Sequence, residues 1–222
     1  MHERRWVFFD VGCTLVDETE AHLERLSRLR RLGSPYRELR DADFLDLCEL
    51  HATRFAPSPY LAALQTLDRS GWKTVASRAA YRHEAERLYP GVLEVLVRLR
   101  ETFRLGVIAN QSAGTANRLR AFGIADAFSV VVSSAEAGLT KPDPRIFARA
   151  LSLAGCAASD ATMVGDRLDN DIGPARAIGL RGIRVLQGFA RKQVPRTETE
   201  RPDETIASIG ELSVDVVEAL LI

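Results

Sequence analysis

The sequence has little cysteine and no long apolar run. Its three cysteines, Cys13, Cys48 and Cys156, form neither a CxxC pair nor a zinc-binding spacing. An odd number of widely separated cysteines is typical of a reduced setting, so we expect no disulfide framework. No apolar run approaches the roughly 20 residues of a membrane-spanning helix, and the first residues show no apolar signal stretch. We therefore expect a cytoplasmic protein with no membrane partner.

The chain also lacks an excess of charge of either sign. Its 222 residues include 30 Lys and Arg and 30 Asp and Glu, so the formal net charge is zero. This balance argues against a nucleic-acid surface as the main partner. Lysine itself is scarce, with three residues against 27 arginines. Hydrophobic residues make up 46% of the chain, which is enough to bury a sizeable core in one large domain, or in a core domain with a small insert.

Short apolar runs, rich in β-branched residues, alternate with helical patterns along much of the chain. Such runs are typical of buried strands in a parallel sheet. They occupy residues 6–9, 105–108, 129–132, 162–164 and 182–185, with a weaker one at 205–209. The helical patterns cover residues 92–100, 115–122, 144–153 and 214–221. The alternation predicts right-handed crossovers and a doubly wound, mostly parallel, Rossmann-like α/β sheet.

One stretch interrupts this alternation, because no convincing strand occurs between residues 18 and 89. Helical patterns there cover residues 23–32, 40–53, 59–70 and 77–88. We therefore predict a helical domain at residues 18–89, inserted into a core of residues 1–17 and 90–222. Such an insert would lie over the carboxyl edge of the sheet, where ligands of α/β proteins bind. Within the core, the polar residues 188–203 predict a surface loop.

Polar clusters follow four of the predicted strands. Because the carboxyl ends of parallel strands meet at one edge of a sheet, we expect the four clusters to share one site. Asp10 ends the first strand and precedes a turn at Gly12. An aspartate in this place suits a nucleophile or a metal ligand, and the alternative is an aspartate that only caps a helix. Asn110 and Ser112 follow a second strand, where they offer donors to an oxyanion or cap the next helix.

The other two clusters add a cation and several carboxylates. Lys141 lies between turn-forming residues in a chain that otherwise uses arginine. A compact ammonium at this place indicates a chemical need, the alternative being a solvated loop lysine. Asp166, Asp169 and Asp171 lie within six residues and would repel one another without a cation or solvent. Hard oxygen ligands suit Mg²⁺, so we predict a magnesium site here rather than a solvated acidic loop.

Taken in order, the four clusters resemble the four motifs of the haloacid dehalogenase superfamily, whose members are aspartate-nucleophile hydrolases. The resemblance spans Asp10 to Asp171, and its most specific segments are TKPDPRIF and VGDRLDND. The helical insert is similar to the mobile cap domain of that family. The resemblance therefore implies a hydrolase of a small phosphorylated substrate, with Mg²⁺ as its cofactor.

The same resemblance implies a role for each matching residue. Asp10 would attack phosphorus and form an aspartyl-phosphate, while Lys141 would neutralise charge on Asp10 and on the phosphoryl oxygens. Mg²⁺ would be bound by Asp10, by Asp166 and by the backbone carbonyl of Gly12. Asp171 would complete or support that metal site.

Two positions depart from the family pattern. Phosphatases of the family carry a second aspartate two residues after the nucleophile, and that position is Gly12 here. Loss of a general acid–base group typically lowers the rate by about 10²–10⁴. The usual Ser or Thr of the second motif is replaced by Ala109, so Asn110 is left to contact the phosphate through its amides.

These departures keep two further hypotheses open. Carbon–halogen hydrolases of the superfamily also lack the second aspartate, because a halide leaves without a proton, although they need no Mg²⁺. A weakened or inactive family member that binds a metabolite or a protein is the other alternative. The identity of the substrate and the oligomeric state do not follow from the sequence.

Overall fold

The computed structural model describes residues 5–221, which divide into two units. Unit 1 is formed by the described residues up to Val16, by Leu88–Gln187 and by the described residues from Pro195 onward. Unit 2 is formed by Asp17–Arg87 and by the short segment Gly188–Val194.

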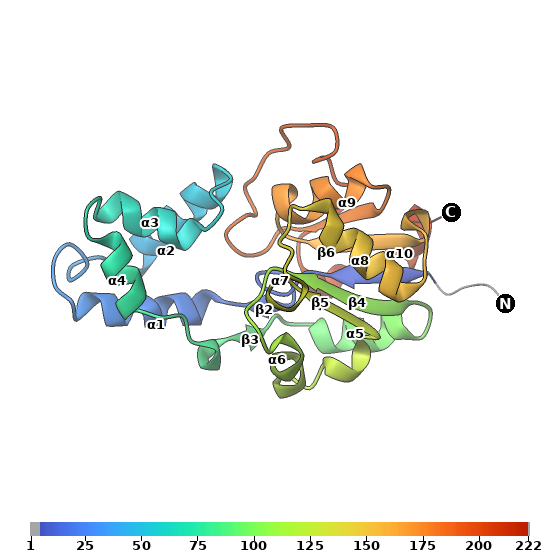
Figure 1. Ribbon diagram of the computed structural model, residues 1–222, viewed down its shortest axis with the longest axis horizontal. Coiled ribbons are helices and arrows are strands. Elements are labelled where there is room, and N and C mark those ends of the chain that lie inside the picture. Colours follow the sequence, from blue (N-terminus) through green and yellow to red (C-terminus); the bar gives the residue numbers. More distant parts are fainter. Residues whose placement is uncertain (1–4, 222) are drawn as a thin grey trace. The chain divides into compact units, whose positions relative to one another are not determined.

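Unit 1 is built on a six-stranded sheet with the strand order β5-β4-β1-β6-β7-β8 (Figure 1). Every paired strand in it runs parallel to its neighbour. The strands are β1 (Trp6–Phe9), β4 (Arg104–Ala109), β5 (Val130–Ser133), β6 (Ala161–Gly165), β7 (Arg181–Val185) and β8 (Glu204–Ile206). The order places β1 between the strands of two oppositely directed sets of crossovers, so the predicted doubly wound α/β fold is confirmed.

Helices cover both faces of this sheet (Figure 1). They are α5 (Val92–Arg100), α6 (Thr115–Ala121), α7 (Ser134–Ala137), α8 (Pro144–Ala154), α9 (Gly173–Ala177) and α10 (Val214–Leu220). Short 3₁₀ turns occupy Ala125–Ala127 (η2), Ala158–Asp160 (η3) and Ile209–Glu211 (η5), and a π-helical turn, η4, occupies Leu168–Ile172.

Strand β1 shows how the sequence specifies the three layers. Successive side chains of a strand point to opposite faces, and all four side chains of β1 are buried. Val7 and Phe9 pack into one hydrophobic cluster with α5 and α10. Trp6 and Phe8 pack into a second cluster with α8 and α9. An apolar run without polar alternation therefore marks a strand that is covered on both faces.

Unit 2 is helical, and two short strands lie at its junction with unit 1. Strands β2 (Val16–Asp17) and β3 (Arg87–Leu88) form a separate two-stranded sheet. The helices are α1 (Thr19–Arg30), α2 (Asp41–Thr53), α3 (Pro59–Leu67) and α4 (Trp72–Arg78), followed by the 3₁₀ turn η1 (His83–Ala85). Their shared core includes Leu26, Phe44 and Leu64, all fully buried. That unit 2 acts as a mobile cap stays a prediction.

Two local predictions were wrong. The helix expected over residues 77–88 does not form, because α4 ends at Arg78 and the backbone of Arg87 and Leu88 pairs with β2 instead. The segment 188–194, assigned to the core domain from the sequence, belongs to unit 2. There the buried carboxylate of Glu49 forms ion pairs with Arg191 and Lys192, and Gln193 donates a 2.9 Å hydrogen bond to the carbonyl of Ala52.

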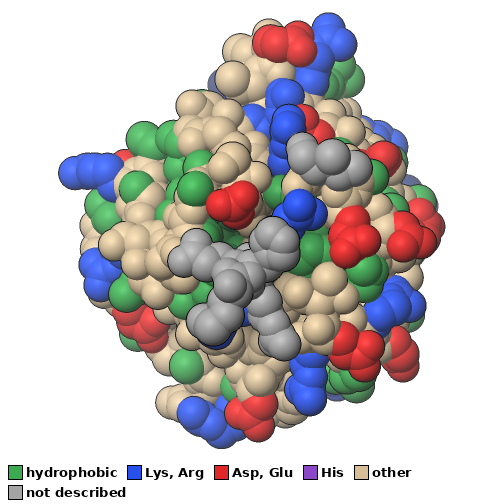
Figure 2. All heavy atoms as spheres, turned by 90° about the vertical axis from the view of Figure 1, so that its right-hand side faces the viewer, with side chains coloured by type: hydrophobic (Ala, Val, Ile, Leu, Met, Phe, Trp, Pro, Cys, Tyr) green, Lys and Arg blue, Asp and Glu red, His purple; other side chains and the backbone are tan. Residues whose placement is uncertain are grey.

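The surface carries charges of both signs. Figure 2 shows acidic and basic side chains interspersed over one face, as the formal net charge of zero leads one to expect. Among residues 5–221, no helix combines the length and the apolar character needed to cross a bilayer. The cytoplasmic location stays a prediction.

Candidate active site

The pairing of β1 with β6 brings two of the predicted carboxylates to the same edge of the sheet. Phe9 lies opposite Val164 in the parallel register, and the backbone N–H of Asp10 extends the ladder with a 2.9 Å hydrogen bond to the carbonyl of Val164. Asp166 follows β6 directly. Both side chains are largely buried, with exposed fractions of 9% for Asp10 and 4% for Asp166.

Lys141 joins this pair to a third carboxylate. Its ammonium donates hydrogen bonds of 2.6 Å to Oδ1 of Asp10 and of 2.6 Å to Oδ1 of Asp171. Burial works to lower the pKa of Lys141, but the two carboxylates outweigh it and the pKa is raised. The lysine therefore remains an ammonium at neutral pH and holds Asp10 in one orientation.

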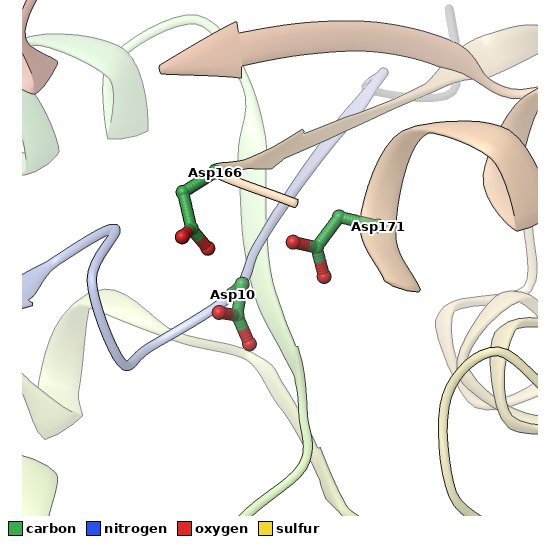
Figure 3. A group of neighbouring side chains, drawn as sticks. All are labelled: Asp10, Asp166 and Asp171. Carbon is green, nitrogen blue, oxygen red and sulfur yellow. The ribbon is translucent and has the colours of Figure 1, made fainter. Parts of the chain in front are cut away.

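The three carboxylates form a compact group that could hold a metal ion. One oxygen each from Asp10, Asp166 and Asp171 lie within 4.8 Å of one another, and Figure 3 shows the three side chains converging. The carboxylate of Asp166 accepts no hydrogen bond from any described residue, although it is buried. A buried carboxylate without a donor is costly, and a divalent cation with a preference for oxygen would satisfy it.

Electrostatics support the same conclusion. Burial, followed by repulsion from Asp171 and Asp10, raises the pKa of Asp166 well above its ordinary value. Burial also raises the pKa of Asp171 to about 6, against the opposing effect of Lys141. One ammonium does not neutralise three buried carboxylates. The residues present therefore fit a divalent cation such as Mg²⁺.

Local structure around Asp171 depends on a glycine. A Cβ atom added to Gly165 would lie 2.5 Å from the side chain of Asp171, so only glycine permits this approach. The second carboxylate oxygen of Asp171 accepts a 3.0 Å hydrogen bond from the backbone N–H of Arg167. With one oxygen on Lys141 and the other on this N–H, Asp171 also holds the lysine and the following turn in place.

Asn110 has a contact that the sequence did not reveal. Its Oδ1 accepts a 2.8 Å hydrogen bond from the backbone N–H of Lys141, and its Nδ2 donates a 2.9 Å hydrogen bond to the carbonyl of Lys141. The side chain of Asn110 thus holds the backbone of Lys141 in place. A phosphate contact through its amides stays a prediction, as does metal binding by the carbonyl of Gly12.

Asp169, the remaining member of the predicted acidic cluster, lies outside this carboxylate group. Its oxygens accept hydrogen bonds of 2.7 Å and 3.0 Å from the guanidinium of Arg167. The spacing of one residue between Arg167 and Asp169 was the available signal for this pair. Asp169 is therefore paired with Arg167, and the group that could hold a metal ion consists of the other three aspartates.

The two residues that depart from the family pattern, Gly12 and Ala109, bring no polar side chain to the site. Gly12 lies in a tight turn in which the amides of Leu15 and Val16 donate to the carbonyl of Val11, and it contributes no side chain. Cys13, the next residue, has a left-handed backbone with φ of 60°. Ala109 is fully buried at the end of β4 and so presents no hydroxyl to the site.

Comparison with known proteins agrees with this geometry. A model of the haloacid dehalogenase-like hydrolases matches residues 7–185. The chain belongs to this family. The match includes Asp10, Lys141, Asp166 and Asp171 and the larger part of each unit. The resemblance seen in the sequence is therefore confirmed, and the protein is a hydrolase of that family.

Curated relatives of this hydrolase include two glyceraldehyde 3-phosphate phosphatases. The one from Methanopyrus kandleri is 36% identical over 154 residues, which cover 67% of this chain and 66% of the relative. The one from Pyrococcus abyssi is 33% identical over 189 residues, which cover 80% and 79%. Among solved structures, a predicted phosphoglycolate phosphatase from Haemophilus somnus 129PT has a TM-score of 0.74 at 21% identity and covers 99% of both chains. That last likeness concerns the fold alone.

Proposed function

We propose that this hydrolase is a Mg²⁺-dependent phosphatase of a small phosphorylated metabolite, with Asp10 as its nucleophile. The observation that carries the proposal is the arrangement of Lys141 between Asp10 and Asp171, with Asp166 close by and without a donor. The names of the two curated relatives support phosphate esters as the substrate class.

The side chains of the site suit phosphoryl transfer, which depends mainly on positioning and on neutralisation of charge. Lys141 fixes one oxygen of Asp10 at 2.6 Å, and the other oxygen attacks phosphorus while the bond from phosphorus to the ester oxygen breaks. Water then cleaves the aspartyl-phosphate, which releases phosphate and restores the carboxylate. Bound Mg²⁺ would supply the positive charge that allows two anions to meet, and Asp10, Asp166 and Asp171 would hold it.

Gly12 limits which esters react quickly. The turn at this position offers no acid to protonate the departing oxygen. Esters with a good leaving group, such as phenols, need little protonation, whereas alkyl alkoxides need it. We therefore expect phenyl phosphates to react faster than alkyl phosphates, by a larger factor than in an enzyme that has the acid.

Hydrolysis of a carbon–halogen bond is the second candidate, and Gly12 is the observation that favours it. A halide leaves without a proton, so the missing acid would cost nothing. Halide displacement by Asp10 has no need of a divalent cation, however, and the group of three buried carboxylates would then be unexplained. This reading ranks below the phosphatase for that reason.

One assay distinguishes the two reactions. The purified protein is given p-nitrophenyl phosphate or 2-chloropropionate, each with Mg²⁺ or with EDTA, beside the Asp10→Asn variant. We expect phosphate release that is abolished by EDTA and by Asp10→Asn. Halide release that is insensitive to EDTA would replace the proposal with the second candidate. The absence of both products from folded protein with Mg²⁺ would reject both.

A further inference from the structure

The chain that leaves β4 is held by the first residue after β5. The parallel pairing of the two strands ends where Ala109 lies opposite Ser133. Beyond that point, the hydroxyl of Ser134 accepts a 3.1 Å hydrogen bond from the backbone N–H of Gln111 and donates a 3.1 Å hydrogen bond to the carbonyl of Gln111. A hydroxyl can donate and accept at the same time. The side chain of Ser134 therefore continues the attachment of the two strands after the sheet ends.

Two further contacts restrain Gln111. The backbone N–H of Ala135 donates a 3.3 Å hydrogen bond to the carbonyl of Gln111, and Nη1 of Arg118 donates a 2.6 Å hydrogen bond to Oε1 of its side chain. All of these residues belong to unit 1. Gln111 is thus held through its backbone and through its side chain, although it lies in a loop and is only half-buried.

The residue before Gln111 holds Lys141. Asn110 accepts a 2.8 Å hydrogen bond from the backbone N–H of Lys141 and donates one of 2.9 Å to its carbonyl. The ammonium of the same lysine reaches Asp10 and Asp171. A series of direct contacts therefore runs from the loop after β4 to the carboxylates of the site.

Residues 134–141 are attached to this loop at both of their ends. Ser134 bonds to Gln111 at the start of the segment, and Lys141 bonds to Asn110 at its end. The two loop residues are consecutive, and the peptide bond that joins them is planar and stiff. A shift of one loop residue is therefore passed to the other, and two points of attachment fix the orientation of the segment that ends at the lysine.

We propose that Ser134 is a positioning residue, which acts on Lys141 through the loop after β4. Its hydroxyl holds Gln111 in place, and the adjacent Asn110 then sets the position of the lysine backbone. This inference rests on the proposed function, because it gives Ser134 a task in the same reaction. Rates respond strongly to such placement, since a displacement of about 1 Å can lower a rate by a factor of about 10².

Hydrogen exchange tests this connection without any turnover. Ser134→Ala removes only the hydroxyl, and alanine is a good helix former at the start of α7, so we expect a folded protein. Exchange followed by NMR should become roughly three- to tenfold faster at the N–H of Gln111, which loses its acceptor, and also at the N–H of Lys141. The control is Ser152→Ala on α8, which removes an exposed hydroxyl and should change neither rate. Unchanged exchange at Lys141 in folded Ser134→Ala would overturn the proposal.

Kinetics with p-nitrophenyl phosphate and Mg²⁺ test whether the connection reaches the chemistry. We expect Ser134→Ala to lower kcat roughly three- to tenfold and Ser134→Thr, which keeps the hydroxyl, to remain within about twofold of the wild type. Residues that act through one another have non-additive effects. The double variant Asn110→Ala/Ser134→Ala should therefore have a kcat within about twofold of that of Asn110→Ala. A further loss as large as that of Ser134→Ala alone would show that the serine acts elsewhere, and would overturn the proposal.

The two measurements separate this inference from the proposed function. If the wild type releases no phosphate, but exchange at Lys141 is still faster in Ser134→Ala, the phosphatase is refuted and the connection from Ser134 to Lys141 is supported. If Ser134→Ala releases phosphate at the rate of the wild type, the positioning role is refuted and the phosphatase is supported.

Discussion

Replacement of Lys141 by methionine tests the electrostatic arrangement of the site. Methionine retains much of the length of the lysine side chain but removes the ammonium that lies 2.6 Å from Asp10 and 2.6 Å from Asp171. Both carboxylates are at least nine-tenths buried. Without Mg²⁺, the variant therefore holds three carboxylates within 4.8 Å of one another and no ammonium between them.

The expected loss of stability follows from this burial. Removal of one partner from a buried ion pair typically costs about 3–5 kcal/mol, which for a protein of this size lowers Tm by roughly 6–20 °C. Protonation of the carboxylates limits the cost, so the loss should be smaller at pH 5 than at pH 7.5. Millimolar Mg²⁺ should stabilise the variant more than it stabilises the wild type, because the variant has more uncompensated negative charge.

The assay is thermal unfolding in EDTA and in Mg²⁺, with Lys192→Met as the matched control. Lys192 forms an ion pair with Glu49, but its side chain is 68% exposed, and an exposed pair contributes at most about 1 kcal/mol. A Lys141→Met protein that is as stable in EDTA at pH 7.5 as the Lys192→Met protein would refute the reasoning. An equal response of both variants to Mg²⁺ would refute the metal site.

Three further predictions concern the same site. Gly12→Asp restores the missing acid and should raise kcat on alkyl phosphates, by up to about 10²–10⁴, and a folded variant with no gain would contradict the account of the leaving group. Asn110→Ala removes both hydrogen bonds to the backbone of Lys141 and should lower kcat roughly tenfold or more with little change in global Tm; an unchanged kcat would show that Lys141 needs no clamp. Because the pKa of Asp166 and that of Asp171 are both raised by folding, the folded protein binds these protons more tightly than the unfolded chain. In EDTA the free energy of unfolding should therefore fall as the pH rises from about 4 to about 6, by up to about 1.4 kcal/mol per unit for each group, whereas Mg²⁺ should remove this slope. Denaturant titrations across that range measure it, and a flat profile in EDTA would count against the coupling of the carboxylates.

The core of the fold could be predicted because its signals are local. The run Trp6–Phe9 is apolar at every position, which is the pattern of a strand covered on both faces, and it ends at Asp10 where the buried strand ends. Strand order then brings the carboxyl ends of β1, β4 and β6 to one edge. The position of the polar clusters at strand ends therefore predicted that they share one site, whereas the choice of Asp171 over Asp169 came from the family resemblance.

What the sequence did not reveal depends on contacts between distant segments. The apolar spacing over residues 77–88 is compatible with a helix, but pairing of Arg87 and Leu88 with β2 prevails over local propensity. Residues 188–194 mix apolar side chains such as Phe189 with polar ones. Nothing in this composition shows that they pack with Glu49 and Ala52, more than 130 positions away. The clamp of Asn110 on Lys141 likewise joins backbone and side chain across 31 positions.

The central claim is that Asp10 forms a covalent bond to phosphorus. Its most direct test is mass spectrometry of the protein after rapid acid quench of a reaction with p-nitrophenyl phosphate and Mg²⁺. We predict a peptide that contains Asp10 and carries the mass of one phosphoryl group, present in the wild type and absent both with EDTA and in Asp10→Asn. Steady turnover with no phosphorylated peptide at any quench time, or a phosphoryl group on a different residue, would contradict the account.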